Sequence, residues 1–160
     1  MEKRNDFKPD RKFWFAVFFL YLFILSIFIL FKHPKKEVHS AIHSSFNKTV
    51  VEKGYQAANF IPFHSIKLYL SERMPKRKAL INLGGNFLGF IPLGFILPML
   101  SGRINTLLKI TLSIFFISLG FELIQLITNT GVFDVDDLML NTLGGFAGAV
   151  IFQLYIRRFR

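Results

Sequence analysis

The sequence predicts an all-α, polytopic membrane protein in which four transmembrane helices form a small bundle. Three observations support this fold class: hydrophobic residues make up 52% of the 160-residue chain, its mean hydropathy is +0.42, and its apolar residues gather in four long runs. A soluble domain of this length needs more polar chain than this to cover a single core. We therefore expect a multi-pass protein of the cell membrane.

The first apolar run, residues 13–31, has no charged residue in FWFAVFFLYLFILSIFILF. At about 1.5 Å per residue it spans close to the roughly 30 Å of a hydrocarbon core. Basic residues precede it, as in a signal peptide, but the run is too long and no A-x-A cleavage site adjoins it. It is thus predicted to be a retained anchor after a basic tail, residues 1–12.

Three further runs, residues 80–100, 107–127 and 138–156, follow with short polar turns between them. Each is long enough to cross a bilayer as a helix. In the first of these three, Pro92 and Pro98 each remove a backbone hydrogen bond, so that helix is predicted to be kinked or broken. G-x-x-x-G motifs, which let helices approach closely, occur at Gly85/Gly89 and at Gly144/Gly148.

The distribution of basic residues predicts the orientation of the chain. The amino-terminal tail has five basic residues in 12, the carboxyl end has three more, and the third loop, 128–137, has none. By the positive-inside rule both termini are predicted to be cytoplasmic and the first loop, 32–79, extracellular. The triplet Lys76–Lys78 opposes this assignment because it directly precedes a span. Part of the first loop, residues 57–70, is amphipathic and is expected to lie at the membrane interface, with Pro62 interrupting any earlier helix.

The charge and residue content also exclude several functions. The net charge of +10 comes from basic residues that flank apolar runs, which favours anionic lipid over nucleic acid as a partner. There is no cysteine and no zinc motif, and His39 and His43, spaced i, i+4, are interpreted as solvated loop residues. We predict no metal site and no cofactor.

Polar residues within the spans are costly and therefore informative. Apart from Gln153, near the far end of the last span, they occur as three pairs at helical spacing, which puts each pair on one helix face: Asn82/Asn86, Glu122/Gln125 and Asp137/Asn141. Because consecutive spans are antiparallel, all three pairs are expected at the same membrane face. The sequence thus predicts one outward-facing binding site formed by these six residues, with Asp134, Asp136 and Asp137 at its rim.

A structural role for the same residues stays open. Buried amides can simply join helices, at about 0.6 kcal/mol per interaction. Asp134 can cap the last helix, and the macrodipole favours Asp136 and Asp137 in its first turn. For Glu122 a functional role is favoured, because a carboxylate about five residues deep must be neutral, paired or hydrated.

Three blocks of the sequence resemble the VanZ-like family of membrane proteins. They are NFIPF at 59–63, NLGGNFLGFIPLGFILP at 82–98, and FELIQ through DVDDLMLNTLGG at 121–145. Residues 80–160 would form the family core, with the resemblance starting at about 59. Family members often carry a basic residue before the acidic cluster, whereas 129–132 has none.

The resemblance implies an accessory protein of the cytoplasmic membrane of Gram-positive bacteria that alters the cell envelope and susceptibility to the glycopeptide teicoplanin. Such a protein would bind membrane lipids, a lipid-linked cell-wall precursor or a membrane protein. An alternative is an intramembrane enzyme acting on a lipid or cell-wall precursor, with Glu122 and Asp134 or Asp137 as general acid and base. The chain lacks a nucleophile elbow, a P-loop and a second inverted half, which favours binding over catalysis or transport.

Reporter fusions test the predicted orientation. We expect a cytoplasmic reporter to be active when fused after Arg160 and inactive when inserted near Thr128, because both termini are predicted to be inside. The opposite pattern would show that the chain is inverted.

Overall fold

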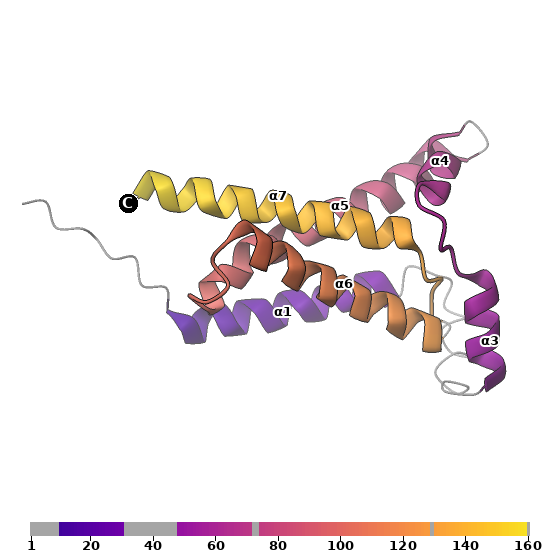
Figure 1. The fold of residues 1–160 in the computed structure, drawn as a ribbon, viewed down its shortest axis with the longest axis horizontal. Coiled ribbons are helices and arrows are strands. Elements are labelled where there is room, and N and C mark those ends of the chain that lie inside the picture. The colour runs from indigo at the N-terminus through magenta and orange to yellow at the C-terminus, as the bar shows by residue number, and fades with distance from the viewer. Residues whose placement is uncertain (1–9, 31–47, 72–73, 129, 160) are drawn as a thin grey trace, which may run out of the picture.

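The structure, a computed structural model, describes residues 10–30, 48–71, 74–128 and 130–159 as a bundle of long helices with two short helices at one end (Figure 1). The helices are α1 Arg11–Leu30, α3 Lys48–Ala57, α4 His64–Leu70, α5 Lys76–Leu100, α6 Leu107–Thr128 and α7 Val135–Phe159. Four of them, α1, α5, α6 and α7, are long and apolar enough to cross a membrane. The predicted all-α class and the number of spans are therefore confirmed.

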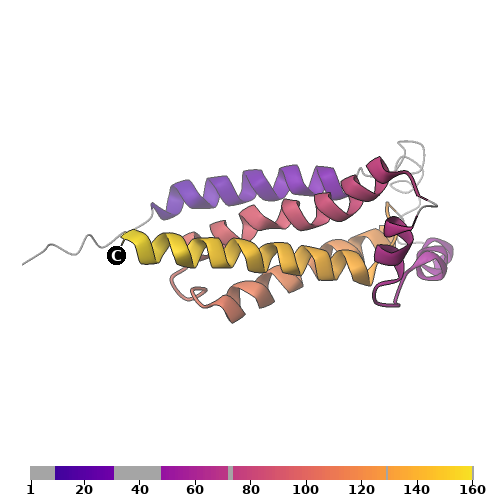
Figure 2. The same cartoon turned by 90° about the horizontal axis from the view of Figure 1, so that it is seen from above.

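The long helices run antiparallel in chain order, and Figures 1 and 2 show both ends of the bundle. We call one the first-loop end, where α1 and α6 end and α5 and α7 begin, and the other the terminal end. Helices α5 and α7 have 25 residues each, more than the predicted 21 and 19. At about 37 Å they exceed a hydrocarbon core of roughly 30 Å. Their polar first turns therefore reach headgroup level.

Helix α5 is continuous from Lys76 to Leu100, with Pro92 and Pro98 inside it. Of the two predicted outcomes, a kink and a break, the break is therefore excluded. Each proline removes only one backbone hydrogen bond, and packing against neighbouring helices tolerates that loss in a span. Around Pro92, α5 is held by α1, whose Tyr21 hydroxyl donates to the Gly89 carbonyl at 2.8 Å.

Glycines bring the backbones of α5 and α7 into direct contact. A Cβ added at Gly144 would lie 2.0 Å from the Phe87 carbonyl oxygen, and one at Gly148 would lie 1.9 Å from that of Ile91. On α5, Gly94 faces the Gly145 carbonyl in the same way, at 2.0 Å. The G-x-x-x-G of α7 is thus a site of close helix approach.

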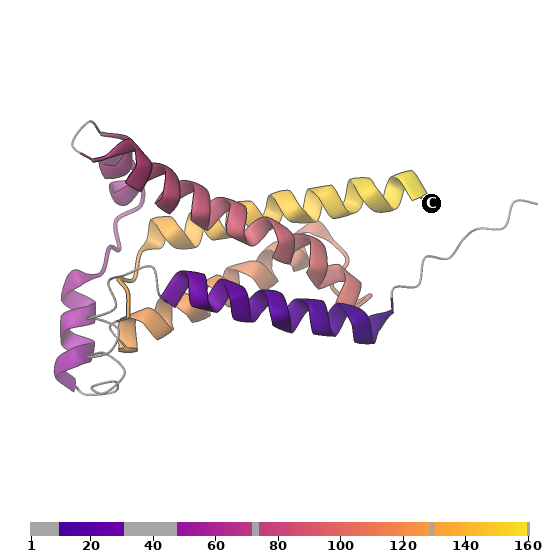
Figure 3. The ribbon, with the colours of Figure 1, turned by 180° about the vertical axis from the view of Figure 1, so that it is seen from behind.

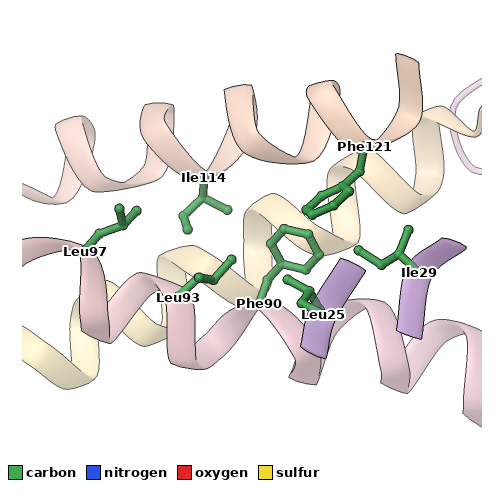
Figure 4. Packing of buried hydrophobic residues seen from close by; sticks show 7 residues of the cluster. All are labelled: Leu25, Ile29, Phe90, Leu93, Leu97, Ile114 and Phe121. Carbon is green, nitrogen blue, oxygen red and sulfur yellow. The ribbon is translucent and has the colours of Figure 1, made fainter. Parts of the chain in front are cut away.

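The other predicted motif, in α5, faces α1 and makes a different contact. Gly85 receives the ring of Phe28, 3.1 Å from an added Cβ, and Gly89 receives the Leu25 side chain at 3.4 Å. An apolar cluster joins α1, α5 and α6 on this side of the bundle (Figure 4). Its members are Leu25, Ile29, Phe90, Leu93, Leu97, Ile114 and Phe121. Side chains, rather than backbone contacts, therefore hold α1.

The first loop contains helical structure that the sequence did not predict. Helix α3 runs across the first-loop end of the bundle, and α4 lies beside the start of α5 (Figures 1 and 3). Gly54 of α3 packs on α6, where an added Cβ would be 2.4 Å from the Leu126 carbonyl oxygen. The chain does turn at Pro62 before α4, and Phe63 adopts φ 64° there. His39 and His43 lie outside the described residues.

A glycine substitution tests the contact between α5 and α7. Replacing Gly148 by Ala should destabilise the protein by about 1–3 kcal/mol, because the new methyl group overlaps a backbone carbonyl that cannot move away alone. Thermal unfolding in mild detergent measures this change. Gly120→Ala is the matched control, because an added Cβ there meets nothing within 4 Å. Equal melting temperatures for the two variants would contradict the assigned packing.

Candidate functional site

Five of the six predicted binding residues are buried in the bundle near the first-loop end. Asn82 and Asn86 lie on α5, Glu122 and Gln125 on α6, and Asn141 on α7, with between 2% and 7% of each residue exposed. Asp137, the sixth, is half-buried in the first turn of α7. The structure therefore gathers the predicted set at one end, but the individual contacts differ from residue to residue.

Glu122 links α6 to the start of α7. Its Oε2 accepts a hydrogen bond from the backbone N–H of Asp134 at 2.9 Å, and only 2% of the residue is exposed. Two candidate catalytic residues thus meet through the backbone of Asp134. An acceptor at this point satisfies an N–H group at the amino end of α7, where the helix offers no partner of its own.

Asn141 and Ser118 connect the same two helices one turn further into the bundle. Asn141 Nδ2 donates to Ser118 Oγ at 2.8 Å, and Ser118 is fully buried. Asn141 Oδ1, in contrast, has no hydrogen-bond partner among the described residues, although only 2% of Asn141 is exposed. Ser118 shares a helix face with Glu122, four residues later. The Asn141 side chain is therefore on the side of α7 that faces α6.

The amides on α5 and at the end of α6 make more local contacts. Gln125 Nε2 donates to the Ile29 carbonyl of α1 at 3.3 Å. Asn82 Nδ2 donates at 2.8 Å to the Lys78 carbonyl in its own helix, so this bond links no second element. Asn86 is buried one turn after Asn82, on the same helix face.

The turn before α4 pairs with the turn before α7 as a short parallel bridge between Asn59 and Asp134. The Asn59 N–H donates to the Phe133 carbonyl at 2.8 Å, and the Val135 N–H donates to the Asn59 carbonyl at 3.0 Å. The Asn59 side chain adds a bond from Nδ2 to Asp134 Oδ1 at 2.8 Å. Backbone and side-chain bonds together fix the first loop to α7.

The Asp134 carboxylate accepts three hydrogen bonds, which occupy both of its oxygens. Besides Asn59, the Asp136 N–H donates to Oδ1 at 2.9 Å, and the Ser65 hydroxyl donates to Oδ2. The bond from Asp136 is a helix cap, as the structural reading of the sequence proposed. Both oxygens of Asp134 therefore take part in joining α4 to α7.

Asp136 caps α4 from a different part of the chain. Its two oxygens accept the N–H groups of Phe63 and Ile66, the latter at 3.1 Å. Phe63, at the N-cap of α4, has no side-chain acceptor to serve that helix. Asp136 is fully buried, so its expected place at an exposed rim is wrong. The bonds to the first loop explain this burial.

Asp137 acts electrostatically on the same short helix. Burial, and then the nearby carboxylates of Asp137 and Asp134, raise the pKa of the Tyr69 hydroxyl above its ordinary value. Both effects disfavour a charged phenolate beside the acidic turn. Tyr69 of α4 thus lies within electrostatic reach of Asp137, the one residue of the turn that belongs to the predicted binding set.

Three residues that contribute hydrogen bonds to this region were not predicted as site residues: Asn59, Ser65 and Ser118. The sequence did give a signal for Asn59, which is the first residue of the NFIPF block. The Asp-x-Asp spacing of 134 and 136 also places two acceptor side chains in one turn, which suits a neighbouring segment that offers several donors. Serines give little signal, because a hydroxyl costs little in an apolar run. No group of three His, Cys, Asp or Glu residues able to hold a metal ion occurs in the described ranges.

Comparisons with known proteins agree with the resemblance of the three sequence blocks. The model of the VanZ/LLP1 family matches residues 18–156. Protein VanZ of Enterococcus faecium is 38% identical over 69 residues, which are 43% of this chain and 42% of that protein. The chain thus covers less than half the length of that relative. No solved structure was found that matches.

Asp136→Asn tests how the first loop is held. The asparagine keeps one acceptor but sets an NH₂ group against a backbone donor, so we expect a loss of about 1–3 kcal/mol and faster hydrogen exchange at residues 63 and 66. Glu52→Gln, on the exposed side of α3, is the control and should change neither quantity. Unchanged exchange in Asp136→Asn would contradict the assigned cap.

Proposed function

The chain belongs to the VanZ/LLP1 family, and on this premise we propose that it is an accessory protein of the bacterial cytoplasmic membrane that lowers susceptibility to teicoplanin. It does so by binding a lipid-linked cell-wall precursor, or a membrane protein, at the polar site near the first-loop end. The site faces the outside of the cell if both termini are cytoplasmic, as the basic residues predict.

The buried Oδ1 of Asn141, which has no hydrogen-bond partner in the described part of the chain, is the observation on which the proposal of binding rests. A buried acceptor without a donor costs about 1–3 kcal/mol, and a ligand that supplies a hydroxyl or amide N–H recovers this energy. Lipid-linked cell-wall precursors combine an apolar chain with a head rich in such groups. Glu122, on the α6 face that carries Ser118, adds a carboxylate acceptor to the same region.

The hydrogen bonds of the acidic turn support binding over catalysis. A general acid or base must exchange a proton with its substrate, and this needs an oxygen that can reach it. Both oxygens of Asp134 and both of Asp136 instead accept donors from the protein itself. The enzyme alternative would therefore depend on Glu122 with Asp137, without Asp134.

Glu122→Gln tests the proposal in a susceptible Gram-positive host. We expect the variant to lose the increase in teicoplanin tolerance that the unchanged protein confers, because the carboxylate charge is gone. Its melting temperature should stay close to that of the unchanged protein, since the glutamine Oε1 can still accept the Asp134 N–H. Minimum inhibitory concentrations and thermal unfolding give the two readouts.

Gln153→Leu is the matched control, because it removes an amide from α7 near the terminal end, far along the chain from the polar site. This variant should keep full teicoplanin tolerance. If both variants lose tolerance equally, the polar residues act only as contacts between helices. If the well-folded unchanged protein confers no tolerance, the proposed phenotype itself is refuted.

A further inference from the structure

Helix α4 and the first turn of α5 form a surface at the edge of the bundle. They contact one another, and Figures 1 and 2 show α4 beside the start of α5, outside the cluster of spanning helices. Because α5 is longer than the hydrocarbon core is thick, its first turn lies at the level of the lipid headgroups. The surface therefore meets the bilayer where headgroups and acyl chains adjoin.

One part of this surface is apolar and exposed. Ile61 and Phe63 precede α4 and are 67% and 51% exposed, and Leu70 at the end of α4 is 72% exposed. In water such side chains would be unfavourable, whereas at a membrane interface they insert among the acyl chains. The hydrogen bonds of Asp134 and Asp136 fix the segment that presents them.

The other part is basic. Lys67 on α4 and Lys76, Arg77 and Lys78 on α5 are all exposed. Residues 60–80 contain five basic residues and a single acidic one. Of the described acidic side chains near this surface, Asp134 and Asp136 accept hydrogen bonds from the first loop, and Asp137 acts electrostatically on Tyr69 of α4. The four lysine and arginine side chains are therefore available to the headgroup region, and within the described residues neither α4 nor the first turn of α5 contains a carboxylate of its own.

From this pairing of apolar and basic groups we propose that α4 and the first turn of α5 bind anionic phospholipid headgroups in the leaflet at the first-loop end. The apolar residues take up the acyl chains, and the four cations bind the phosphates. A basic residue near a membrane surface attracts anionic lipid measurably, and clusters of such residues select it over zwitterionic lipid. This lipid-binding surface does not depend on the buried polar residues of the site proposed above.

An introduced indole can report the local lipid composition. The chain has one tryptophan, Trp14, which lies in α1 near the terminal end. A Trp14→Phe, Ile61→Trp protein therefore carries its single indole in the proposed surface. It is reconstituted in phosphatidylcholine bilayers that contain either brominated phosphatidylglycerol or brominated phosphatidylcholine, and quenching measures how strongly each lipid binds near position 61.

We expect phosphatidylglycerol to be preferred on the order of fivefold, because several cations act together. Changing Lys67, Lys76, Arg77 and Lys78 to Gln should abolish the preference. Arg157→Gln with Arg158→Gln, the matched change at the terminal end, should leave it intact. About 1 M salt, with a screening length near 3 Å, should also remove it, which tests the charge effect without any substitution.

Three results would each overturn the proposal. Absence of quenching by both lipids would show that the surface lies outside the bilayer. Equal quenching by the two lipids would show apolar contact without selection of the headgroup. A preference that survives both high salt and the four substitutions would show that other residues select the lipid.

Discussion

Two carboxylates at the start of α7 hold the first-loop end of this protein together. Asp134 and Asp136 accept hydrogen bonds from Asn59, Ser65 and the first N–H groups of α4. In the same turn, the backbone N–H of Asp134 donates a hydrogen bond to Glu122. One short segment therefore sets the position of the first loop above the bundle and of the polar side chains within it.

These contacts also explain how carboxylates remain buried beside a membrane. A buried charge needs partners, and here backbone N–H groups and neutral side chains supply them at helix ends, where donors are left over. The net charge of +10 is carried instead by residues outside the apolar runs. The arrangement leaves the basic residues at the bundle ends available for contact with lipid.

The fold was more predictable from the sequence than the site. Apolar runs report spans directly, because a hydrocarbon core demands length and composition. Helical spacing and antiparallel order placed Asn82, Glu122 and Asn141 at one end of the bundle. Which atoms meet was not predictable, because the partners of Asp136 come from the first loop, about 70 residues away in the chain. Helix α3 does have helical periodicity, but it is only 10 residues long and has too little apolar content to stand out as a long apolar run does. The continuity of α5 through Pro92 likewise depends on neighbours that the local sequence does not show.

The contact between the backbones of α5 and α7 has a consequence for motion. Helices separated by side chains can slide as rotamers change, but carbonyl groups pressed against glycine have no such freedom. We therefore expect the two helices to move as one body. Any opening of the bundle must occur by displacement of α1 or α6 relative to that body, and the seam against α6 is where Ser118 meets Asn141.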